Sequence, residues 1–182
     1  METIKLHDKV FRRTIPYEEI VGRIGLLAGA FNRQWRDSSQ PPVFVSVLNG
    51  AFMFTAELMK RLEFTCELAF VKVMSYTGTE SSGKVTQVIG LDGHAISGRD
   101  VVVLEDIVET GNTIEAVRGM LLGQTPRSIA FASLFYKPEA YVNPFPVDHY
   151  AMELPNDFIV GFGLDYNRLG RNLPDVYTLI TE

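Results

Sequence analysis

Residues 101–114 read VVVLEDIVETGNTI, and this stretch decides the fold. Its four leading aliphatic residues show no polar alternation, which is typical of a strand that is covered on both faces. The carboxylates Glu105 and Asp106 follow directly, then a short loop, then a helix that we expect from about Thr113 to Leu122. In an open α/β sheet, ligands bind at the carboxyl ends of the strands. We therefore expect the ligand site of this protein where the strand meets the loop.

The loop has the composition of a phosphate cradle. Backbone N–H groups at a helix N-terminus bind anions, and a glycine lets the backbone approach the anion closely. The two carboxylates would repel a bare phosphate, but they suit a ribose diol or a magnesium ion, so a sugar phosphate would satisfy both halves. For an isolated acidic pair, solvated carboxylates and a threonine that only caps the helix would be the simpler interpretation. The loop residues concerned are Thr110, Gly111, Asn112 and Thr113.

Strand-like and helix-like segments alternate around this stretch. Apolar residues at three- and four-residue spacing predict helices, and short apolar runs predict strands. The alternation predicts an α/β fold, with a mostly parallel sheet flanked by helices. The expected helices are Tyr17–Trp35 and Ala51–Leu62, and the expected strands are Val43–Leu48, Cys66–Tyr76, Val85–Ile89 and Ser128–Tyr136.

The pattern changes after Pro138. Prolines separate short strands expected at about His149–Met152, Phe158–Val160 and Val176–Leu179, which predicts a small cap, or hood, of irregular β structure. The length of 182 residues is within the usual size of one domain. We therefore expect a single domain over residues 1–182, with the core at about 10–140 and the hood segments at about 141–182.

Composition excludes several classes of protein. The net charge of −5 argues against a nucleic-acid partner, because phosphate contacts dominate the affinity of such proteins. A single cysteine, Cys66, excludes an internal disulfide and a zinc site built from cysteines. No apolar run approaches the ~18 residues of a membrane helix, and the polar start from Met1 to Phe11 does not fit a signal peptide. We expect a cytoplasmic protein with no membrane partner.

The 101–114 stretch closely resembles the phosphoribosyl-diphosphate (PRPP) signature of the type I phosphoribosyltransferases. Further segments occur in the order and approximate spacing of the hypoxanthine-guanine phosphoribosyltransferases: LNGAFMF at 48–54, MSY at 74–76, YKP at 136–138 and FIVGFGLDY at 158–166. The resemblance covers most of the chain from about Val43 to the end. It implies the type I phosphoribosyltransferase fold and a purine-salvage reaction with Mg²⁺ as cofactor. That reaction transfers the 5-phosphoribosyl group from PRPP to N9 of hypoxanthine or guanine, giving IMP or GMP and pyrophosphate.

The resemblance also implies a purine-binding part of the site. Lys137 matches the family lysine that binds the 6-carbonyl oxygen, and Phe158 matches the aromatic residue that stacks on the purine. The backbone from Phe158 to Asp165 would bind N1 and the 2-substituent. Taken alone, Lys137 would be a surface lysine and Phe158 a core residue. The implied purine-binding residues are Lys137, Phe158, Ile159, Leu164 and Asp165.

PRPP binding is implied for residues from four separate segments. Taken alone, Asp165 would be a turn former, Arg171 a solvated arginine, and the small polar residues after Tyr76 an exposed hairpin. The implied residues are Glu105, Asp106, Glu109, Thr110, Gly111, Asn112 and Thr113 for the ribose phosphate; Asn49, Gly50 and Arg171 for pyrophosphate; Ser75 and Tyr76 for a lid over PRPP; and Glu105, Asp106 and Asp165 for magnesium.

Two positions depart from the family pattern. Glu109 stands where the family usually has the aspartate that accepts the purine proton, and its extra methylene moves the carboxylate by about 1.5 Å. Asn49 stands where the family usually has a basic residue, so a charge-assisted contact to pyrophosphate would be missing and PRPP binding weaker. The peptide bond before this position is often cis in that family. We expect Glu109 as general base candidate, with Lys137 and Arg171 as the other catalytic residues.

Three other functions fit some of the same residues. A PRPP-sensing regulatory protein with little or no catalysis is the main alternative, although a pure sensor need not keep a purine pocket. Lys137 argues against adenine, but a 6-oxo group does not separate hypoxanthine from guanine or xanthine. The segment GTESSGK at 78–84 matches part of a Walker A loop, yet Val85 stands where Ser or Thr must bind magnesium. The resemblance suggests a homodimer or homotetramer.

Overall fold

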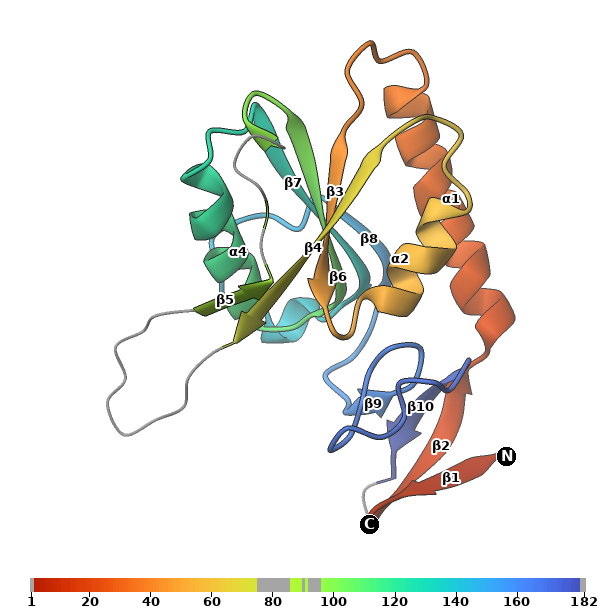
Figure 1. The fold of residues 1–182 in the computed structure, drawn as a ribbon. Helices are drawn as coiled ribbons and strands as arrows, with labels where there is room; N and C mark the ends of the chain where they lie inside the picture. The colour runs from red at the N-terminus through yellow and green to blue at the C-terminus, as the bar shows by residue number, and fades with distance from the viewer. Residues whose placement is uncertain (1, 75–85, 90, 92–95, 181–182) are drawn as a thin grey trace.

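A mostly parallel six-stranded sheet forms the centre of the protein (Figure 1). The computed structural model describes residues 2–74, 86–89, 91 and 96–180. The strand order is β5-β4-β3-β6-β7-β8, and every neighbouring pair is parallel except β4 and β5. The predicted α/β fold is confirmed. The strands are β3 (Val43–Leu48), β4 (Glu67–Met74), β5 (Thr86–Ile89), β6 (Asp100–Val108), β7 (Ser128–Tyr136) and β8 (His149–Glu153).

Helices cover both faces of this sheet, which explains why the central strands are apolar throughout. Figure 1 shows α1 (Tyr17–Trp35) and α2 (Phe52–Met59) on one face and α4 (Asn112–Leu122) on the other. On β6, Val102 and Leu104 pack in the core cluster that contains residues of α1 and α2. Their neighbours on the strand pack in the second cluster, with residues of α4. The four aliphatic residues are all at most 1% exposed, because alternate side chains enter different cores.

A second, antiparallel sheet forms the hood beyond the carboxyl ends of the central strands (Figure 1). Its order is β1 (Thr3–Leu6), β2 (Lys9–Ile15), β10 (Val176–Leu179) and β9 (Ile159–Val160). Two of these strands come from the start of the chain, which the sequence pattern did not assign to the cap. Conversely, β8 was expected in the cap but joins the central sheet, because it pairs in parallel with β7.

One buried carboxylate connects the hood to α1. Helix α1 follows Pro16, which has no side chain able to cap it. The N–H of Tyr17 instead donates to Asp175 Oδ1 at 2.7 Å, and Arg13 Nε lies 2.8 Å from Asp175 Oδ2. Asp175 immediately precedes β10, and Arg13 lies on β2. The same side chain therefore caps the helix and pairs with the neighbouring strand of the hood.

Strand β6 extends four residues beyond the predicted aliphatic run. Its pairing with β7 continues through Ile107 and Val108, so Glu105 and Asp106 lie inside the strand instead of following it. Backbone pairing holds these carboxylates more firmly than a loop would. The segments 75–85 and 92–95, which contain the expected lid and the Walker-like residues, lie outside the described residues. Among the described helices, none is long and apolar enough to cross a membrane.

The ion pair between Arg127 and Asp100, the first residue of β6, predicts how the stability of the protein depends on pH. Arg127 and the Ser128 hydroxyl hydrogen-bond to Asp100 and lower the pKa of its carboxyl from 3.8 to about 2. A carboxyl whose pKa is lowered by folding stabilises the protein fully above its unfolded pKa. That contribution is lost as the pH falls from about 4 toward 2.

We predict that Asp100→Asn lowers the free energy of unfolding by about 1 kcal/mol at neutral pH, since Arg127 is half exposed. The difference from wild type should narrow as the pH falls from 5 to 3, as measured by urea unfolding. Asp37→Asn, which removes the same charge from an exposed turn, is the control and should leave stability nearly unchanged. A pH-independent difference for Asp100→Asn would contradict this account.

Candidate active site

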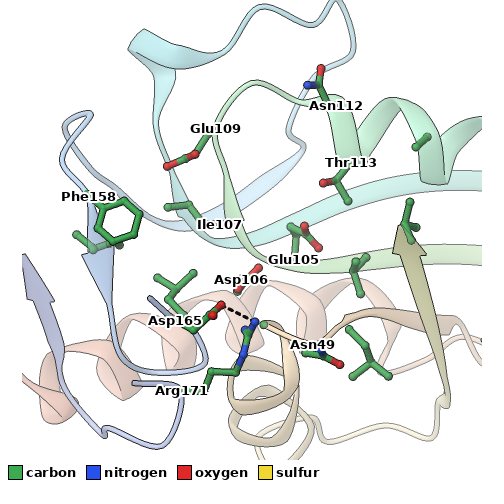
Figure 2. A pocket seen from close by; sticks show the side chains of 17 residues that line it. Asn49, Glu105, Asp106, Ile107, Glu109, Asn112, Thr113, Phe158, Asp165 and Arg171 are labelled. Atoms are coloured by element: carbon green, nitrogen blue, oxygen red, sulfur yellow. Dashed lines mark ion pairs between the residues drawn. The ribbon is translucent and has the colours of Figure 1, made fainter. Parts of the chain in front are cut away.

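A cavity of about 500 Å³ lies at the carboxyl ends of β3 and β6, beneath the hood (Figure 2). A smaller cavity of about 230 Å³ adjoins it and is lined by residues 105–114. Most residues predicted for the site therefore meet in one place, although they come from four distant segments. The larger cavity is lined by Val47, Leu48, Asn49, Gly50, Val73, Glu105, Asp106, Ile107, Glu109, Asn112, Thr113, Ala116, Phe158, Ile159, Leu164, Asp165 and Arg171.

Glu105 and Asp106 form the acidic floor of the cavity. Glu105 is 9% exposed, and its Oε2 atom has no hydrogen-bond partner in the described part of the chain. Burial, and then the neighbouring Asp106, raise the pKa of Glu105 well above its ordinary value. Burial raises the pKa of Asp106 to about 6, although hydrogen bonds from the backbone and the charge of Arg171 oppose it. Two desolvated carboxyl groups of this kind favour a ligand that donates hydrogen bonds or carries positive charge.

Two glycines allow three segments to approach each other around Asp106. A Cβ atom on Gly50 would lie 1.6 Å from Asp106 Oδ2, and one on Gly163 would lie 2.1 Å from the carbonyl oxygen of Gly50. Gly163 has φ of +100°, which side chains rarely tolerate. The peptide bond between Leu48 and Asn49, just before this contact, is cis, as the resemblance implied. The loop after β3 therefore lies directly between β6 and the hood.

Arg171 and Asp165 form an ion pair on the hood side of the cavity (Figure 2). Arg171 Nη2 lies 2.5 Å from Asp165 Oδ1, and Arg171 Nη1 donates to the carbonyl oxygen of Gly163 at 2.6 Å. Asp165 Oδ2 accepts the N–H of Arg168 at 2.7 Å. The predicted pyrophosphate-binding cation and the predicted third magnesium ligand thus neutralise one another across the wall of the cavity.

Lys137 lies beside the cavity and is not part of its lining. It follows the last residue of β7 and is 3% exposed. Its ammonium forms an ion pair with Glu109 and donates to the carbonyl oxygen of Asp157 at 2.7 Å. Glu109 is half exposed and does line the cavity. The two departures from the family pattern thus differ in place: Glu109 contacts the predicted purine-binding lysine, whereas Asn49 lies exposed on the opposite wall (Figure 2).

The loop before α4 leaves the start of that helix without a side-chain cap. The residue that precedes the helix is Gly111, which has φ of +88°. A Cβ there would lie 2.6 Å from Asn143 and from Tyr141. The Thr110 hydroxyl is 3.5 Å from the nitrogen of Asn112, too far to be a strong cap. The N–H groups of the first turn therefore remain available to an anion, as the phosphate-cradle prediction requires.

Some residues of the cavity were not predicted from the sequence, and some predicted residues lie outside the described part of the chain. Ile107 projects into the cavity near Phe158 (Figure 2), and Val73 and Ala116 complete the apolar lining. Successive side chains of a strand point to opposite faces, so Ile107, two residues after Glu105, could have been expected on the same face as Glu105. Ser75 and Tyr76 lie outside the described residues. No group of three or more His, Cys, Asp or Glu side chains could hold a metal ion within the described ranges.

The close approach at Gly163 predicts the result of a single substitution. Gly163→Ala should lower the free energy of unfolding by more than about 2 kcal/mol, because strain at positive φ adds to a backbone clash with Gly50. Gly98 also has positive φ, but a Cβ there meets nothing within 4 Å, so Gly98→Ala should cost only about 1 kcal/mol. Equal losses for the two variants in urea unfolding would argue against the tight contact.

Comparison with known proteins identifies the family that shares this arrangement. The phosphoribosyl transferase domain model matches residues 17–167. The hypoxanthine-guanine phosphoribosyltransferase of Streptococcus pyogenes is 43% identical over 142 residues, which are 78% of each chain. The enzyme of the same name from Streptococcus thermophilus is 40% identical over 166 residues, 91% of each chain. A solved hypoxanthine phosphoribosyl transferase of Trypanosoma cruzi is 31% identical and superposes with a TM-score of 0.85, covering 97% of this chain and 95% of its own. The chain belongs to the phosphoribosyltransferase family and, within it, to the hypoxanthine-guanine phosphoribosyltransferases.

Proposed function

We propose that the cavity transfers the 5-phosphoribosyl group of PRPP to N9 of hypoxanthine or guanine and releases pyrophosphate, a purine-salvage reaction. The observation that supports this proposal most strongly is that two buried carboxyl groups and a helix N-terminus adjoin in one site. Glu105 and Asp106 are desolvated carboxyl groups in need of donors, and an uncapped helix N-terminus lies next to them. A sugar phosphate offers hydroxyl donors to the carboxyl groups and an anion to the helix N-terminus. The relatives are named as enzymes, and no observation on the described residues favours the PRPP-sensing alternative.

The acidic floor would bind the ribose of PRPP. Hydroxyl groups of the sugar can donate to Glu105 Oε2, which has no hydrogen-bond partner among the described residues, and to the Asp106 carboxyl. The same oxygens fit Mg²⁺, since this ion takes one or two protein carboxylates and completes its shell with substrate and water. Asp165, the third predicted ligand, lines the same cavity, but in this structure it does not form with them a group of three carboxylates that could hold the ion. When bound, Mg²⁺ would stabilise the negative charge of the departing pyrophosphate.

The purine would bind between apolar side chains of β6 and the hood. Phe158 and Ile107 face this part of the cavity (Figure 2), and Leu164 also lines it. An ammonium group has three donors, so Lys137 can keep its contacts with Glu109 and with the Asp157 carbonyl while it donates to the 6-oxo oxygen. Glu109 would then lie next to the bound base, where a carboxylate can accept the proton that the purine loses.

Pyrophosphate would leave along the opposite wall. The backbone of Asn49 and Gly50 lies there, together with the Arg171 guanidinium, whose planar set of donors suits a phosphate. Arg171 would exchange its partner Asp165 for the leaving group. Negative charge that develops on pyrophosphate as its bond to the ribose breaks would thus meet a cation already held in position by the Gly163 carbonyl.

A substrate panel with a Lys137 variant tests the purine assignment. We predict that wild type releases pyrophosphate with hypoxanthine and guanine but not with adenine, because an ammonium cannot accept from the 6-amino group. Lys137→Met should raise KM for hypoxanthine by about tenfold or more, with a smaller change in KM for PRPP. Lys60→Met, at an exposed position after α2, is the control. An unchanged KM for hypoxanthine in Lys137→Met would contradict the assignment of Lys137 to the 6-oxo oxygen.

A second variant tests the pyrophosphate wall. We predict that Asn49→Lys lowers KM for PRPP by about three- to tenfold, because it adds a charge-assisted contact at a residue that lines the cavity. Gln34→Lys, which adds the same charge on the exposed face of α1, should have no effect. Equal PRPP affinity in wild type and Asn49→Lys would contradict this account, because the backbone and Arg171 would then bind pyrophosphate equally well without a charge at position 49.

Two expectations from the sequence remain predictions. A homodimer or homotetramer is implied by the resemblance, and the solved Trypanosoma cruzi relative was studied for the role of its C-terminal region in the oligomeric state. Cytoplasmic localisation likewise rests on the sequence.

A further inference from the structure

Phe158 lies in an unusual position for a large apolar side chain. It is 45% exposed although it lines the cavity. Its backbone is held, because its carbonyl oxygen accepts the N–H of Leu179 at 2.9 Å. A half-exposed ring has few packing partners to fix its orientation, so the contacts that it does make decide how it presents its face.

The ring of Phe158 contacts the N-terminal hairpin and the loop after β9. Its centroid lies 6.2 Å from that of Phe11 on β2 and 5.9 Å from that of Tyr166, with the Tyr166 ring nearly perpendicular at 84°. The ammonium of Lys9 lies 5.6 Å from the centroid of Phe158 and 4.8 Å from that of Tyr166. One cation is therefore shared between two rings that already contact each other at an edge.

The turn before β2 holds both Lys9 and Tyr166 in this arrangement. His7 and Asp8 form a two-residue turn between β1 and β2, with Leu6 paired to Lys9. The Tyr166 hydroxyl donates to Asp8 Oδ1 at 2.9 Å, and the His7 ring lies edge-on to the Tyr166 ring at 5.8 Å. The two residues of the turn, and Lys9 at the start of β2, thus all contact Tyr166, the residue after Asp165.

Lys9 acts from outside the cavity. It is not among the residues that line the cavity, and it lines a separate surface hollow of about 460 Å³ with Asp8, Val10, Leu179 and Ile180. Substrate in the main cavity would therefore meet the Phe158 ring, and the ring would meet Lys9 on the hood side. A cation close to an aromatic ring is attracted to the π-electrons and restrains the tilt of the ring.

We propose that Lys9 is a positioning residue for purine binding, which holds the Phe158 ring in the orientation that stacks on the base. This inference rests on the proposed function, since it assumes that Phe158 contacts the purine. The N-terminal hairpin, which contributes no residue to the cavity wall, then takes part in base recognition through one lysine.

Substitutions on the same hairpin separate the charge from the packing. Lys9→Met keeps a long unbranched side chain and removes the cation, whereas Lys9→Arg keeps a cation. Lys5→Met, at an exposed position of β1, is the matched control. We expect Lys9→Met to raise KM for hypoxanthine by about three- to tenfold, with KM for PRPP and kcat changed by less than about twofold. Lys9→Arg and Lys5→Met should behave as wild type.

A second readout does not depend on turnover. Ring resonances of Phe158 in protein labelled at phenylalanine, assigned with Phe158→Leu, should shift in Lys9→Met and not in Lys5→Met. An unchanged KM for hypoxanthine in Lys9→Met, with an active wild type, would overturn the inference, as would equal rises in both KM values. A wild type that transfers phosphoribosyl to no purine would instead overturn the proposed function, and unshifted ring resonances would then also exclude contact between Lys9 and Phe158.

Discussion

The contact of Asp106 with Gly50, and of Gly50 with Gly163, is the constraint on which the site depends. Side-chain atoms at either glycine would overlap with their neighbours by more than an ångström of ordinary contact distance. Only with both glycines present can β6, the loop after β3 and the hood meet at one point. All three segments line the cavity.

Electrostatics makes the same place reactive. The backbone pairing of β6 holds Glu105 and Asp106 inside a strand, where burial raises the pKa of both carboxyls. Hydrogen-bond donors or cations lower the free energy of both carboxyl groups, so the cavity favours a polyhydroxylated or metal-bound ligand. On the facing wall, Asp165 and Arg171 form an ion pair, so the two walls of the cavity differ in charge.

The hood is built from segments that lie far apart in the chain. Its sheet combines strands from both ends of the chain, and Asp175 links that sheet to α1 through Tyr17 and Arg13. The residues of the hood that line the cavity, Phe158 among them, are thus supported by a hairpin that begins at residue 3. The hairpin therefore contacts the wall of the cavity from outside without lining it.

The fold class and the order of the elements from α1 onward could be predicted from the sequence alone. Apolar runs and helical spacing depend on local burial, so the bounds of α1, β3 and β7 followed directly from their residues. The PRPP signature also lies in one continuous segment, which a linear pattern can reveal. Only the tertiary structure decided that β8 leaves the cap, that β1 and β2 join it, and that Lys137 contacts Glu109. The pairing of β8 with β7, the pairing of β2 with β10 and the contact of Lys137 with Glu109 join residues 17 or more positions apart. Their free energy depends on shape and desolvation in three dimensions, which periodicity along the chain does not record.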